Sequence, residues 1–152
     1  MFCFHTMSFE IENDFHEMNE QELKEHKVSM TPDSISVYNE QNHTIISFYH
    51  KRINAIIGAI ADKKTLRKRM EWDYKKAQPI IERIEEYDVM IGKKKRYGFR
   101  YQYTIDHITY IGDVLSVIHK GDYYSICGNY RVENQAYGTE AMAGLFRTMV
   151  LD

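Results

Sequence analysis

Apolar and polar residues alternate along much of the chain, and a period of two is typical of β-strands that bury one face. The pattern is clearest over residues 96–104, where aromatic side chains take every second position and therefore share one face. Residues 108–119 are apolar on both faces, which predicts a central place in the sheet. The predicted strands are residues 8–12, 35–38, 44–51, 80–91 (most clearly 87–91), 96–104, 108–119 and 123–132.

Helices are predicted where apolar residues are spaced three to four positions apart. We expect them over residues 17–28, 65–78 and 137–151, and Pro79 ends the second one. The inward stripe of the second helix is predicted to hold Leu66, Met70, Asp73 or Tyr74, and Ala77, under a basic outer face. The resulting order is strand, helix, hairpin, helix, four-stranded meander, helix. It predicts an α+β fold, with a twisted antiparallel sheet covered by helices.

Length and charge narrow the class of protein further. A chain of 152 residues suits one domain with its own core. The formal net charge of −2 argues against a general binder of phosphate backbones, which needs a dominant basic surface. The first seven residues lack a basic segment followed by a long apolar run, so we expect no signal peptide, no membrane span and a cytoplasmic protein. Cys3 and Cys127 are expected to be free thiols.

Three phrases of the sequence, in this order of elements, resemble the PsbP-like fold family. They are FEIENDF at residues 9–15, YGFRY at residues 97–101, and GDYYSI at residues 121–126, the last followed by a polar break and a terminal helix with Phe146. The family includes a photosystem II extrinsic subunit, a Ran-binding nuclear-import factor and bacterial DcrB-like domains. The resemblance implies a three-layer α/β/α sandwich that docks onto another protein without catalysing a reaction. It does not name the partner, because one fold serves many functions.

Signatures of catalysis and of cofactor binding are missing from the sequence. The seven histidines show no HxxH, HxxxH or HExxH spacing, so no metal site is predicted, although ligands distant in sequence can still converge. There is no GxSxG motif and no phosphate-binding glycine motif. Cys127 is expected in the core. A cluster of carboxylates is expected to form an exposed acidic turn and not an acid–base pair: Glu82, Glu85, Glu86 and Asp88. We therefore predict a protein that is not an enzyme and holds no cofactor.

Two basic clusters suggest an alternative role in binding a nucleic acid or another polyanion. If the second helix lies beside the turn at residues 92–95, the clusters form one positive patch next to Tyr97. Basic side chains interleaved with aromatic rings are typical of proteins that bind single-stranded nucleic acids. The patch would hold Lys63, Lys64, Arg67, Lys68, Lys93, Lys94 and Lys95, with Arg69, Lys75, Lys76 and Arg96 nearby. A solvated helix face and a polar turn explain the same charges without a ligand.

The aromatic row formed by Tyr97, Phe99, Tyr101 and Tyr103 also has two interpretations. It either packs in the core under a helix or lies partly open as a groove for a partner protein. Tyrosine and arginine are enriched where interfaces concentrate their binding energy. Our leading hypothesis is therefore a non-catalytic cytoplasmic protein-binding domain, an adaptor, chaperone or immunity-type protein. Its predicted contact residues are Tyr97, Tyr101, Arg96 and Arg100, on a monomer or homodimer that binds another protein and no membrane.

Overall fold

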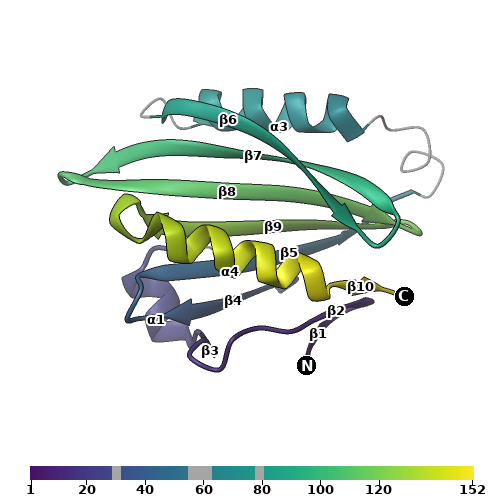
Figure 1. Cartoon of the computed structure of the whole chain (residues 1–152), viewed down its shortest axis with the longest axis horizontal. Helices are drawn as coiled ribbons and strands as arrows, with labels where there is room; N and C mark the ends of the chain where they lie inside the picture. Colours follow the sequence, from purple (N-terminus) through teal and green to yellow (C-terminus); the bar gives the residue numbers. More distant parts are fainter. Residues whose placement is uncertain (29–31, 55–62, 78–80) are drawn as a thin grey trace.

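The computed structural model describes residues 1–28, 32–54, 63–77 and 81–152, with the side chains of residues 63–66 and 77 left aside. Its main element is a seven-stranded sheet in which every neighbouring pair of strands is antiparallel (Figure 1). Across the sheet the strands are β3 (His16–Glu17), β4 (Ser34–Asn39), β5 (Thr44–Arg52), β9 (Asp122–Arg131), β8 (Ile108–His119), β7 (Lys94–Ile105) and β6 (Ile81–Ile91).

Tight turns join the long strands of the meander β6–β7–β8–β9. Two residues link β7 to β8, Asp106 (φ 51°) and His107 (φ 66°), and two link β8 to β9, Lys120 (φ 49°) and Gly121 (φ 82°). Successive positive φ angles give a turn whose twist matches that of antiparallel strands. The meander predicted from the sequence is confirmed, and β8 lies inside the sheet as expected.

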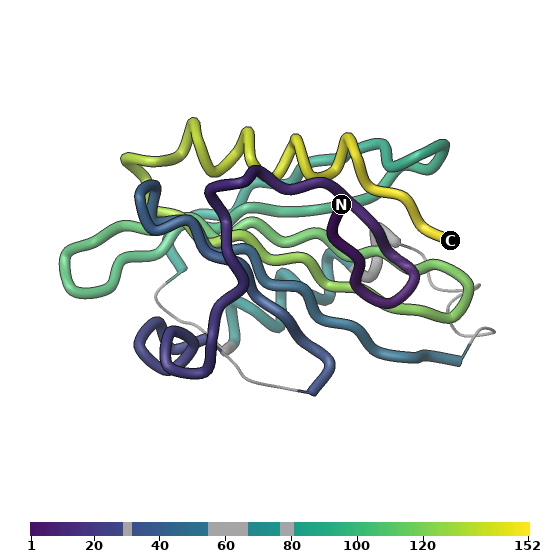
Figure 2. Tube along the Cα trace, turned by 90° about the horizontal axis from the view of Figure 1, so that it is seen from below, coloured from purple at the N-terminus to yellow at the C-terminus, as the bar shows by residue number. Residues whose placement is uncertain are grey.

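A second, smaller sheet was not foreseen. It contains β1 (Phe2–Phe4), β2 (Met7–Phe9) and β10 (Val150–Leu151). Together with the helix α4 (Gln135–Thr148), which follows the 3-10 turn Val132–Asn134, it covers one face of the main sheet (Figure 2). The core on this side is apolar and aromatic: the rings of Phe9 and Phe48 stack with centroids 4.6 Å apart, and both side chains are 1% exposed.

The opposite face of the sheet is covered by α3 (Lys63–Ala77). Met70 and Tyr74 of this helix pack on Phe99, Tyr101 and Val114 of the sheet. The two faces together make the three-layer arrangement that the sequence predicted. The predicted helix end at Gln78 and Pro79, and the side chains of Leu66 and Ala77, lie outside the part of the chain described.

Several element boundaries differ from those predicted. The first predicted strand, residues 8–12, is Met7–Phe9, and the first helix is only α1 (Glu20–Glu25). A capping box explains where α1 begins, because Asn19 and Glu22 satisfy each other's backbone N–H groups. The final helix ends at Thr148, three residues early, because the chain then extends to pair with β2. The predicted acidic turn is also wrong: Glu82 to Asp88 are strand residues of β6.

A candidate binding surface on helix α3

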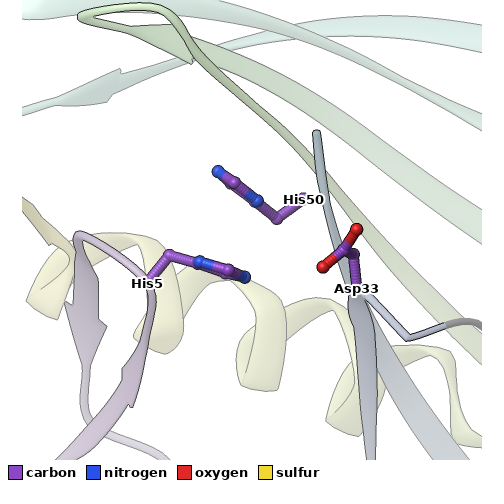
Figure 3. A group of neighbouring side chains, drawn as sticks. All are labelled: His5, Asp33 and His50. Atoms are coloured by element: carbon purple, nitrogen blue, oxygen red, sulfur yellow. The ribbon is translucent and has the colours of Figure 1, made fainter. Parts of the chain in front are cut away.

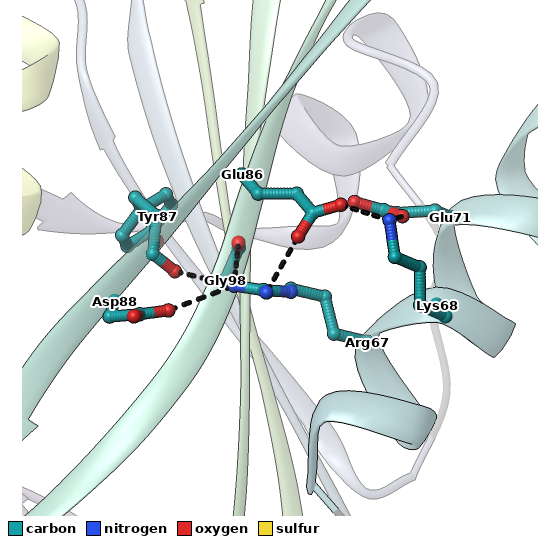
Figure 4. Close-up of polar contacts among 7 residues, drawn as sticks. All are labelled: Arg67, Lys68, Glu71, Glu86, Tyr87, Asp88 and Gly98. Carbon is teal, nitrogen blue, oxygen red and sulfur yellow. Dashed lines mark hydrogen bonds and ion pairs between the residues drawn. The ribbon is translucent and has the colours of Figure 1, made fainter.

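Arg67 of α3 is the centre of an ion-pair cluster that fastens the helix to strand β6 (Figure 4). Its side chain is only 10% exposed. Nη2 lies 2.6 Å from a carboxylate oxygen of Glu86, and Nη1 lies 2.9 Å from Oδ1 of Asp88. Nη1 also donates to the backbone oxygen of Tyr87 at 3.0 Å, and the guanidinium lies 5.2 Å from the ring centroid of Tyr97. We call Arg67, Lys68, Glu71, Glu86 and Asp88 the α3 clamp.

Lys68 extends the α3 clamp outward. Its ammonium pairs with Glu86 and lies 3.6 Å from Glu71. The hydrogen bond from Lys68, with the nearby charge of Arg67, lowers the pKa of Glu86. Burial, followed by repulsion from Glu86, raises the pKa of Glu71, whose side chain is 9% exposed. The clamp therefore brings opposite charges together between two layers.

The outward side of α3 presents Trp72, the chain's single tryptophan, which is 54% exposed. Two cations lie over its ring: the Arg69 guanidinium is 5.7 Å and the Lys76 ammonium 4.9 Å from the ring centroid. Arg69 also pairs with Asp73 at 3.4 Å along the helix. We call Arg69, Trp72 and Lys76 the Trp72 surface. The sequence offered a signal for it, since a lone tryptophan stood in a basic outer helix face, but the prediction did not single it out.

The aromatic row lies mainly in the core beneath α3. Phe99 is 1% and Tyr101 6% exposed, and the ring of Tyr74 meets both edge-on, at 5.5 and 5.3 Å. The Tyr101 ring lies so close to Gly112 that a Cβ atom there would be 2.1 Å from it. Burial raises the pKa of Tyr101 and raises that of Tyr103 to about 12. The structure thus places Tyr101 in the core, while Tyr97 and Tyr103 are half-buried.

Arg96 and Arg100, the two arginines predicted beside this row, lie on the opposite face of β7, which is the α4 side of the sheet. Arg96 is 2% exposed, and its Nη1 donates to the backbone oxygen of Ile118 at 2.9 Å; burial lowers its pKa. Arg100 pairs with the fully buried Asp113, Nε to Oδ2 3.2 Å, and lies over the ring of Tyr87. Burial raises the pKa of Asp113. The four predicted contact residues are therefore divided between two faces of β7, and their role in binding stays a prediction.

The two predicted basic clusters lie in different layers. Arg67 and Lys68 belong to the α3 clamp and pair with carboxylates of β6. Lys93, Lys94 and Lys95 are exposed and lie in, or directly after, the turn that joins β6 to β7. Polyanion binding by these residues with Lys63 and Lys64 stays a prediction.

Other candidate chemical groups are dispersed. Cys127 lies under α3, where burial raises the pKa of its thiol, and Cys3 is exposed. One group of side chains with metal-binding capacity does converge, namely His5, Asp33 and His50 (Figure 3). Among the residues described, no helix combines the length and the apolar character needed to cross a bilayer.

The antiparallel sheet between helical layers, in this strand order, is a PsbP-like fold, as the sequence phrases implied. No protein-family model matches the chain, and no curated protein matches it by sequence. The fold is therefore shown by structural similarity to solved proteins whose sequences are only 8% or 9% identical to this chain.

Three solved structures illustrate the likeness. Cyanobacterial PsbP (CyanoP) from Synechocystis sp. is 9% identical with a TM-score of 0.62, covering 97% of this chain and 87% of the other. The Ran-binding protein Mog1p of Saccharomyces cerevisiae is 8% identical with a TM-score of 0.62, covering 96% and 90%. A Bacteroides thetaiotaomicron protein is 13% identical with a TM-score of 0.63 over 97% of this chain, which spans 45% of that protein's chain. The neighbours also include LpqN of Mycobacterium tuberculosis, which is involved in cell envelope biogenesis.

Proposed function

We propose that this chain is a non-catalytic, cytoplasmic protein-binding domain, and that it binds an acidic segment of its partner through the Trp72 surface. The observation that carries the proposal is a tryptophan that is 54% exposed between two cations. It lies on a helix whose inward side is attached to the sheet by the α3 clamp. Tryptophan, tyrosine and arginine are the residues that most often supply binding energy at interfaces.

The charge of α3 supports an acidic partner. Seven of its fifteen residues are Lys or Arg, and two are acidic. The α3 clamp neutralises part of this charge on the sheet side, whereas Arg69 and Lys76 lie with Trp72 on the outward side. An acidic segment with an apolar side chain would find both a ring and cations there.

The structural neighbours agree with a binding role at the level of the fold. One of them is named as a Ran-binding protein, so this architecture can present a surface to a protein partner. The identity of 8% carries no residue of that surface to this chain. The support for the particular surface therefore comes from α3 itself.

The test uses Trp72 as its own reporter, because its fluorescence is the chain's only tryptophan signal. A partner captured from the native cells at physiological salt is titrated into the untagged protein. We expect the emission of Trp72 to shift to shorter wavelength and its quenching by acrylamide to fall. Because charges contribute, binding should weaken as salt shortens the range of electrostatic attraction.

Two variants make the test specific. Trp72→Ala should abolish capture, while Met90→Ala, which removes a side chain that is 55% exposed on β6, should capture normally. Capture that survives Trp72→Ala contradicts the proposal. Co-purification of a nucleic acid that salt removes, with no protein partner, would favour the polyanion alternative instead.

A further inference from the structure

Three side chains from separate parts of the fold meet at one edge of the molecule. His5 lies in the turn between β1 and β2, Asp33 directly precedes β4, and His50 lies on β5 (Figure 3). One ligand atom from each of the three lies within 4.8 Å of the others. From this convergence we infer a binding site for a divalent transition metal ion such as Zn²⁺, formed by His5, Asp33 and His50.

His50 is oriented as a metal-binding histidine requires. Its Nε2 lies 2.8 Å from Oδ1 of Asp122, and both side chains are about nine-tenths buried, at 10% and 8% exposed. Asp122 is held in turn by Arg52 at 3.0 Å. A histidine that gives one ring nitrogen to a carboxylate presents the other to a metal, and such outer partners usually accompany metal-binding histidines. Nδ1 of His50 is thus the atom available to the ion.

The carboxylate of Asp122 accepts from two cationic or hydrogen-bonding partners at once, the imidazole of His50 at 2.8 Å and the guanidinium of Arg52 at 3.0 Å. A negative charge behind His50 makes the imidazole a better electron donor to a cation. Asp122 is accordingly a positioning residue of the site and not one of its ligands.

The main chain brings the other two ligands to His50. The backbone N–H of His50 donates to the backbone oxygen of Asp33 at 2.9 Å, which fixes the start of β4 beside β5. His5 has a left-handed backbone (φ 55°), which turns β1 back into β2 and carries its exposed ring over that of His50. The two rings stack with centroids 3.7 Å apart and planes inclined by 20°.

Coordination needs only a small rearrangement of exposed side chains. In a tetrahedral zinc site with bonds near 2.0 Å, ligand atoms lie about 3.3 Å apart, so the present spacing must contract by at most about 1.5 Å. Stacked rings direct their lone pairs in parallel, and the exposed His5 ring must therefore turn about its Cα–Cβ and Cβ–Cγ bonds. Two imidazoles and a carboxylate suit zinc and neighbouring transition metals and leave a position for water.

The bound ion would join the small sheet to the main sheet. Because His5 belongs to the β1–β2 turn while Asp33 and His50 belong to the β4–β5 side, one ion ties three chain segments together. Binding to the folded state alone stabilises it. We therefore expect Zn²⁺ to raise the melting temperature of the native chain.

The experiment titrates Zn²⁺ into the whole chain, purified without a histidine tag and freed of metal by EDTA, in a calorimeter. Co²⁺ serves as a second probe, since its visible absorption reports nitrogen ligands and coordination number. We expect one ion per chain. Two variants, His5→Asn and Asp33→Asn, should each weaken binding about tenfold or more.

Matched controls separate this site from incidental binding. His43→Asn changes another exposed histidine that also has a left-handed backbone (φ 49°) in a hairpin turn, and Cys3→Ser removes the exposed thiol two residues before His5. Both should bind Zn²⁺ as the native chain does. The inference is overturned if the native chain does not bind, or if His5→Asn binds as tightly as His43→Asn.

Discussion

The two faces of the main sheet are covered in different ways. On the α4 side, a helix and a second small sheet bury an extended apolar and aromatic core that includes Phe9, Phe48 and Ile126. On the α3 side, α3 covers a smaller cluster around Phe99 and Tyr101, and the α3 clamp holds the helix to the sheet edge. The first layer depends mainly on hydrophobic burial. The second depends partly on charges, and its outer side carries the Trp72 surface.

If the proposed binding through the Trp72 surface is correct, this difference separates the residues that stabilise the fold from those that bind a partner. The α3 layer needs only its inward residues for attachment, so its outward residues are available for recognition. Substitutions in each layer test this difference between the two faces.

The largest effect is expected from the α4 side. Phe48→Ala should lower the free energy of unfolding by about 3–5 kcal/mol, because it removes a ring that is 1% exposed and leaves a cavity against Phe9. Urea denaturation followed by circular dichroism measures the change. Tyr49→Ala is the matched control on the same strand: this ring is 38% exposed, and its loss should cost less than about 1 kcal/mol. Equal costs for the two variants would disprove the assigned core.

A smaller effect is expected from the α3 clamp. Arg67→Met should cost about 2 kcal/mol, because it leaves Glu86 and Asp88 without their shared buried cation. Arg69→Met removes a cation whose side chain is 71% exposed, and should cost less than about 0.5 kcal/mol. Denaturation at low and high salt measures both. If the α3 clamp contributes to stability through its charges, the difference in the free energy of unfolding between the two variants should narrow as salt increases.

The smallest stability effect concerns pH. The pKa of Glu86 is lowered in the folded chain by its hydrogen bond from Lys68 and by Arg67. The unfolded chain therefore binds more protons at this group, and the group stabilises the fold above its ordinary pKa of 4.5 and ceases to do so as pH falls through the lowered value. Relative to Glu86→Gln, the native chain should lose stability on acidification. Parallel stability–pH curves for the two proteins would contradict this.

Much of the fold was predictable because its long strands carry strong patterns. The aromatic alternation over residues 96–104 and the double-faced apolar run over residues 108–119 identify β7 and β8. The small sheet was missed because β1 and β10 have three and two residues, too few for a period to show. The acidic part of β6 resembles a turn in the sequence because it lies on an edge strand, whose exposed positions carry charges in place of apolar residues.

The candidate sites were less predictable, for physical reasons. Whether the face of β7 that carries Tyr101 is buried or exposed depends on where α3 packs. The alternation of aromatic and polar residues over residues 96–104 would be the same with or without a helix on that face. The β4–β5 hairpin brings Asp33 to His50, but His5 reaches them only because the β1–β2 turn packs against this hairpin, which no local spacing encodes. Arg67 was predicted as part of a charged surface, and only its contacts with β6 reveal it as an attachment.

The most direct test of the separation between stability and binding compares Trp72→Ala with Tyr101→Ala, measuring melting temperature and capture of the protein partner side by side. Trp72→Ala should melt like the native chain, within about 0.5 kcal/mol, and lose capture. Tyr101→Ala should lose about 3 kcal/mol of stability because its ring is 6% exposed beneath α3. A Trp72→Ala protein that melts early, or a Tyr101→Ala protein that melts normally yet no longer captures the partner, would contradict the account.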